Sequence, residues 1–117
     1  MKNGDASLLE KMIKYSDEIS GTIKRFDLDF NKFKEDYVVK NAIAMCVLQI
    51  GELCTKLTGE FRTKYTRMPW RDIIAMRNRM AHSYESTNIE IIWDVAGNNI
   101  PELKAYCENI LKENQIN

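Results

Sequence analysis

The chain has 117 residues, and its 17 Lys and Arg are balanced by 17 Asp and Glu, so the formal net charge is zero. This length suits one compact domain over residues 1–117 and leaves no room for a second core of ordinary size. A zero net charge argues against a uniformly basic coat for nucleic acid. Helix-forming residues dominate, while Gly and Pro number only five and two. This composition favours an all-α bundle.

No apolar run approaches the roughly 20 residues that span a bilayer. The first five residues also lack the apolar core of a signal peptide. We therefore expect a cytoplasmic protein with no membrane partner. Cys46, Cys54 and Cys107 are odd in number and lack C-x-x-C spacing, which indicates neither a disulfide framework nor a zinc site. We expect no metal and no cofactor.

The first half of the chain predicts two main helices. An amphipathic helix is expected over about residues 7–26, followed by a turn or short helix over residues 27–31. The longest helix should cover about residues 35–57, and apolar residues on two of its sides predict a central position. Gly51 inside this helix costs about 1 kcal/mol relative to Ala, which the close approach of a neighbouring backbone would explain.

The second half predicts the motif helix and the closing helices. A polar link leads to a helix over residues 70–84, with Pro69 in its first turn. A polar connector over residues 83–88 and a helical stretch over 89–95 follow. We expect a break at residues 97–99, after which Asn99 caps the last helix. The chain should therefore form an up-and-down bundle of four or five helices.

Arg77 falls where the motif helix should be apolar. With an advance of about 100° per residue, one stripe of the helix contains Trp70, Ile73, Ile74, Met80, Ala81 and Tyr84. Arg77 lies near the middle of this stripe, and a guanidinium is rarely buried without a partner. Either Arg77 pairs with a carboxylate, for which Glu52 is a possible partner, or it faces a cleft that needs a positive charge. Glu52 itself is either partly buried or a surface residue at the rim of its helix.

His82 is the only histidine of the chain and can transfer protons near neutral pH. The same helical geometry places it about 140° from Arg77, so the two cannot easily grip one phosphate from a single rigid helix. The helix could fray before His82, the Arg77 side chain could bend round, or two copies could meet across a dimer axis. Asn78 shares the flank of His82 and could orient its ring. Alternatively, His82 caps carbonyl groups, and Tyr84 is a boundary aromatic rather than a hydroxyl near a cleft.

A dimer would supply the chemistry that one chain lacks. Metal-free RNA cleavage needs a base for the 2′-hydroxyl and an acid for the leaving 5′-oxygen, and a two-fold dimer provides two copies of His82. The planar donors of Arg77 match phosphate oxygens. The segment from residue 60 to residue 82 contains six basic and two acidic residues. Arg71 and Arg79 are its candidate RNA contacts, although a solvated basic loop is the alternative.

A resemblance to a known family covers most of the chain. The run from Met68 to Tyr84 reads MPWRDIIAMRNRMAHSY. It resembles the signature of the HEPN superfamily, above all its HepT-like branch, whose pattern is R-x-x-x-x-H-x-Y with Asn after the Arg. The segment 50–53 resembles the Gly-Glu segment of that branch, and the stretch 92–103 resembles its closing helices.

The resemblance implies a homodimeric helical bundle of HEPN type, with the motif in a cleft between the protomers. Members are metal-independent RNA endonucleases that act as toxins. Their partner is a minimal nucleotidyltransferase antitoxin, which can neutralise the toxin by adenylylating (AMPylating) the motif tyrosine. The matching positions imply catalysis by Arg77 and His82, positioning by Asn78, support of Arg77 by Glu52, and modification of Tyr84. The alternative is a non-catalytic module that binds nucleotide or RNA, or docks the nucleotidyltransferase.

Overall fold

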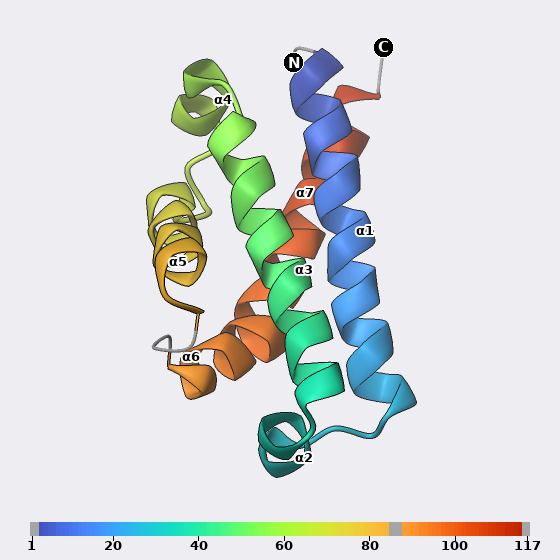
Figure 1. Cartoon of the computed structure of the whole chain (residues 1–117). Coiled ribbons are helices and arrows are strands. Elements are labelled where there is room, and N and C mark those ends of the chain that lie inside the picture. Colours follow the sequence, from blue (N-terminus) through green and yellow to red (C-terminus); the bar gives the residue numbers. More distant parts are fainter. Residues whose placement is uncertain (1–2, 85–87, 116–117) are drawn as a thin grey trace.

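The computed structural model describes residues 3–84 and 88–115 of the chain. Its four longer helices are α1 (Asn3–Arg25), α3 (Tyr37–Lys56), α5 (Trp70–His82) and α7 (Ile100–Asn114). Successive long helices run in opposite directions, and α5 lies on the side of α3 that faces away from α1 (Figure 1). The prediction of an all-α helical bundle is confirmed, although the described residues form seven α-helices where four or five were expected.

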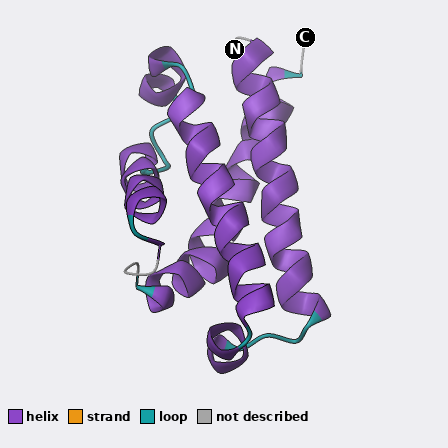
Figure 2. Cartoon of the chain, in the orientation of Figure 1, coloured by secondary structure: helices purple, strands orange, loops and turns teal. Residues whose placement is uncertain are grey.

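Three short helices connect the longer ones: α2 (Phe30–Glu35), α4 (Gly59–Lys64) and α6 (Ile89–Asp94). Each begins at a side chain that accepts a backbone N–H of its first turn, namely Asp29, Thr58 and Asn88 respectively. Only helices and loops are drawn over the described residues in Figure 2. The polar link that we expected after α3 contains the helix α4.

The prediction that the central helix is the longest is wrong, because α1 has 23 residues and α3 has 20. α1 begins before the expected residue 7 because its first turn is fixed by a distant contact. The buried carboxylate of Asp5 accepts hydrogen bonds from the Thr58 backbone N–H at 3.0 Å and from its hydroxyl at 2.8 Å. Such a contact between segments 53 residues apart leaves no local signal in the sequence.

The expected break at residues 97–99 is also wrong. The chain passes from α6 through a π-helical turn, η2 (Val95–Asn99), directly into α7. Asn99 has helical dihedral angles and its side chain caps nothing. Burial of Ala96 holds this turn against the core, and the Asn98 amide donates to Asp94 at 2.6 Å. Packing therefore outweighs the low helix propensity of Gly and Asn here.

α3 is central, as its two apolar sides predict. Its buried residues are Val39, Ile43, Ala44, Val47, Ile50, Gly51, Leu53 and Cys54. By length and composition α3 could also cross a membrane, with a mean hydropathy of 1.3. The expectation that no segment approaches a membrane span therefore does not hold for this helix, although the core helix of a bundle passes the same test.

The three cysteines are free thiols. Cys54 of α3 and Cys107 of α7 are fully buried in the core. Burial raises the pKa of each of these two thiols to about 12. Cys46 is half-buried, and desolvation, followed by the nearby Glu18, also raises the pKa of its thiol. Cys54 and Cys107 therefore act as small apolar core residues.

Candidate active site

An aromatic cluster fixes the start of α5. Pro69 occupies the N-cap position, one residue before the first turn that we predicted for it. The Trp70 indole N–H donates to the Tyr65 carbonyl at 2.6 Å. The Trp70 ring also lies 5.9 Å from the Phe61 ring and 6.3 Å from the Tyr106 ring, measured between centroids. The first residue of the motif helix is thus held by α4 and α7.

The middle of α5 approaches α3 closely at Gly51. A Cβ atom on Gly51 would lie 2.5 Å from the Cβ of Arg77 and 3.0 Å from its Cγ. The Cα of Arg77 would be only 3.6 Å away. Ordinary carbon contacts lie at about 3.5–4.0 Å. Glycine is therefore needed at this position of α3 so that the stem of Arg77 can pass. This is the close approach of a neighbouring helix that we expected from the glycine.

Arg77 is held by polar contacts on both sides. Its Nη2 forms an ion pair with Glu52 Oε2 at 2.5 Å, and its Nη1 donates to Asn78 Oδ1 at 2.9 Å. Its Nε is buried and has no hydrogen-bond partner within the described part of the chain. The side chains of Arg77 and Glu52 are 30% and 36% exposed. Of the two alternatives, the structure shows the carboxylate partner, in a pair that solvent still reaches.

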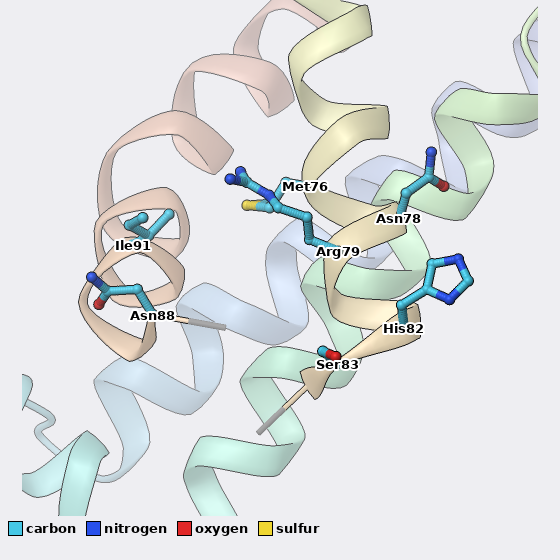
Figure 3. Close-up of a pocket in the computed structure, with 7 residues that line it drawn as sticks. All are labelled: Met76, Asn78, Arg79, His82, Ser83, Asn88 and Ile91. Atoms are coloured by element: carbon cyan, nitrogen blue, oxygen red, sulfur yellow. The ribbon is translucent and has the colours of Figure 1, made fainter. Parts of the chain in front are cut away.

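His82 is the last residue of α5, and it is exposed. Asn78 and His82 project from one flank of the helix, whereas Met76 and Arg79 project from another, toward Ile91 of α6 (Figure 3). α5 stays helical through His82, so the helix does not fray before it. The backbone N–H of Ser83 bonds to the Arg79 carbonyl at 2.9 Å and ends the helix. Within residues 3–84 and 88–115, the His82 ring has no hydrogen bond.

A groove of about 470 Å³ lies between the end of α5 and α6. Its lining residues are Met76, Asn78, Arg79, His82, Ser83, Asn88 and Ile91. Arg77 does not line it, because Arg77 points toward α3. In one chain the two predicted catalytic side chains therefore do not converge, whereas the structure brings together Arg77, Glu52 and Asn78.

The remaining predicted RNA contacts are dispersed along α5. Arg79 lines the groove beside His82, while Arg71 lines a second groove of about 510 Å³ at the start of the helix, together with Arg62 of α4. The positive charge of the basic segment 60–82 is therefore spread along the whole length of α5. A polyanion longer than one nucleotide would be needed to contact both grooves.

Tyr84 follows the helix and lies against the first half of α3. Its hydroxyl donates to Asn41 Oδ1 at 2.8 Å, and burial raises the pKa of the phenol. The ring borders an apolar hollow of about 300 Å³ lined by Asn41, Ala44, Met45, Leu48, Met80 and Tyr84. Sequence reasoning missed Asn41, which lies 43 residues from Tyr84 and outside any motif.

The all-helical bundle, with Arg77 and His82 on the outer helix α5 and Tyr84 just after it, agrees with the HEPN-type fold that the sequence resembles. The model of the family "Ribonuclease HepT-like" matches residues 12–110, and the chain belongs to this family. It is therefore an enzyme of the ribonuclease class.

Curated relatives agree with this assignment. "Putative RNase MJ0125" of Methanocaldococcus jannaschii is 30% identical over 107 residues, covering 92% of this chain and 90% of the relative. "Putative RNase TTE0752" of Caldanaerobacter subterraneus subsp. tengcongensis is 35% identical, covering 74% and 77% of the two chains. "Probable ribonuclease HepT" of Thermococcus cleftensis is 26% identical, covering 74% and 78%. No solved structure matches the chain significantly.

Proposed function

We propose that the protein is a metal-independent RNA endonuclease of the cytoplasm, the toxin of a toxin–antitoxin pair, and that a homodimer completes its active site. The observation that carries this proposal is the arrangement on α5. His82 is exposed at the end of the helix, while Arg77 is fixed on the α3 side by Glu52 and Asn78. A two-fold axis beside α5 would supply the second proton-transfer group that one chain lacks.

In this proposal the reaction proceeds by internal attack within the RNA. One His82 removes the 2′-hydroxyl proton, and the oxygen forms a bond to the adjacent phosphorus. The bond from phosphorus to the 5′-oxygen breaks, and the partner's His82 donates a proton to that oxygen. The products are a 2′,3′-cyclic phosphate and a 5′-hydroxyl.

Arg77 would stabilise the charge that builds up on the phosphate oxygens. A guanidinium has five N–H donors, and contacts to Glu52 and Asn78 occupy only part of this set. Those contacts also fix the plane of the group before substrate arrives, which is how preorganised donors contribute to catalysis. In this proposal Glu52 and Asn78 act through Arg77 and do not touch the RNA.

The test is cleavage of a defined RNA in EDTA by wild-type protein and by His82→Ala. We expect wild-type cleavage with cyclic-phosphate ends and no cleavage by the variant. Lys24→Ala, which removes an exposed charge at the end of α1, should cleave as wild type does. Circular dichroism and size-exclusion chromatography verify that each variant keeps its fold and assembly. Undiminished cleavage by His82→Ala would refute the mechanism.

One observation favours a second candidate function, a non-catalytic module that binds RNA or docks the nucleotidyltransferase. Arg77 already has a carboxylate partner, so part of its charge is neutralised within the chain. The same experiment separates the two functions. RNA binding without any cleavage that depends on His82 selects the module.

We further propose that a minimal nucleotidyltransferase antitoxin adenylylates Tyr84. The Tyr84 oxygen would attack the α-phosphorus of ATP, with release of pyrophosphate and of the hydroxyl proton to a base. Tyr84 is 36% exposed, so a partner can reach it once its hydroxyl leaves Asn41. Co-expression with a minimal nucleotidyltransferase should add the mass of AMP to the protein but not to Tyr84→Phe. An unchanged mass of the wild type would contradict this proposal.

A further inference from the structure

Within the described residues, two separate polar contacts join α5 and the residues just after it to α3. One is the ion pair between Arg77 and Glu52, and the other is the hydrogen bond from Tyr84 to Asn41. At 1.5 Å per residue, positions 41 and 52 lie about 16 Å apart along α3. The middle of α5 and the segment that follows its end therefore have independent attachments.

Tyr84 makes a polar contact with α3 and borders an apolar hollow. The Tyr84 side chain lines the apolar hollow together with Ala44, Met45 and Leu48 of α3 and Met80 of α5. The hydroxyl donates at 2.8 Å to Asn41, one turn before Ala44 on the same helix. Because burial raises the pKa of the phenol, Tyr84 remains a protonated donor throughout the neutral range.

His82 is exposed at the last position of α5. The ring makes no hydrogen bond within the described ranges, and the backbone leaves the helix at Ser83 with φ −152° and ψ 67°. Terminal helical turns fray easily, because their last carbonyl groups lack intrahelical partners. Tyr84, two residues after His82, is joined to α3 by its hydrogen bond to Asn41.

We propose that Asn41 is a positioning residue, which accepts the Tyr84 hydroxyl and thereby holds the last turn of α5 and the place of His82. Asn41 lies outside the motif and would never touch substrate. The effect of Asn41 on catalysis rests on the function proposed above, whereas its effect on the position of His82 does not. A group attached to the Tyr84 oxygen would remove the donor and release this turn, so modification would displace His82 and not only obstruct the site.

The test exploits the single histidine of the chain, whose imidazole gives one identifiable set of NMR signals. Asn41→Leu removes the acceptor while keeping a similar shape, and Asn41→Asp keeps an acceptor. Tyr84→Phe removes only the donor. Asn31→Leu, the same substitution on an exposed position of α2, is the matched control.

We expect Asn41→Leu and Tyr84→Phe to shift or broaden the His82 signals to the same extent. The double variant should shift the His82 signals no further than either single variant, because both substitutions remove the same hydrogen bond. Asn41→Asp and Asn31→Leu should leave the signals in place. Circular dichroism should be unchanged throughout, since Asn41 is exposed and Tyr84 lies outside the core.

Cleavage kinetics provide the second readout. Asn41→Leu should lower kcat about tenfold with little change in KM, as a misplaced catalytic group does. Asn41→Asp should keep kcat close to the wild-type value. Unchanged His82 signals in both Asn41→Leu and Tyr84→Phe would overturn the inference. If wild-type protein cleaves no RNA, the proposed function fails, but the NMR comparison still decides whether Asn41 positions His82.

Discussion

Gly51→Ala is the substitution that tests most directly how α5 is seated on α3. The new Cβ would lie 2.5 Å from the Arg77 Cβ, about 1 Å inside ordinary carbon contact. Because the obstructing atoms are the Cβ and Cγ at the base of the Arg77 side chain, a rotamer change of its far end cannot relieve the clash. α5 must move, and the pair between Arg77 and Glu52 must lengthen or break.

The expected magnitude is obtained by comparison with Gly21→Ala. Alanine gains about 1 kcal/mol over glycine inside a helix, and both substitutions receive this gain. A Cβ on Gly21 meets nothing within 4 Å, so only Gly51→Ala incurs the cost of overpacking. That cost is typically about 1–3 kcal/mol. Gly51→Ala should therefore be less stable than Gly21→Ala by about this amount.

Urea unfolding and thermal melts followed by circular dichroism measure this difference. For a domain of this size 1 kcal/mol corresponds to about 4 °C in Tm, so Gly51→Ala should melt about 4–12 °C below Gly21→Ala. Gly21→Ala should melt at or above the wild-type temperature. Equal melting temperatures for the two variants would refute the close approach of α5 to α3 at Gly51.

Three further predictions concern the site and the core. Arg77→Lys keeps the charge but loses the planar fork, so cleavage in a timed RNA assay should fall about 100-fold with the fold intact; near wild-type rates would contradict this role. At pH 8.5 a thiol with a pKa of about 12 is almost entirely protonated, so Cys54 and Cys107 should resist alkylation until the protein unfolds, as peptide mass analysis can follow. Rapid labelling of either in native protein would show that the core opens there. RNA affinity should weaken as salt rises, and Arg79→Ala should reduce the salt slope in a binding titration by about one; an unchanged slope would remove Arg79 from the RNA contacts.

Much of the fold follows from local patterns in the sequence. The period of the apolar residues predicts the long helices, and two apolar sides predict the central place of α3. The errors occur where a distant contact decides the outcome. Asp5 extends α1 by bonding to Thr58, and burial of Ala96 keeps the turn before α7 helical.

For the site, the sequence by itself determines that Arg77 interrupts an apolar stripe and that His82 lies on another flank of the same helix, because helical periodicity is local. Only the tertiary structure decides that Glu52 is the partner of Arg77, that Gly51 leaves room for its stem, and that Asn41 holds Tyr84. These contacts depend on the axial register of α5 against α3. That register arises from packing of residues far apart in the chain, which no local pattern encodes.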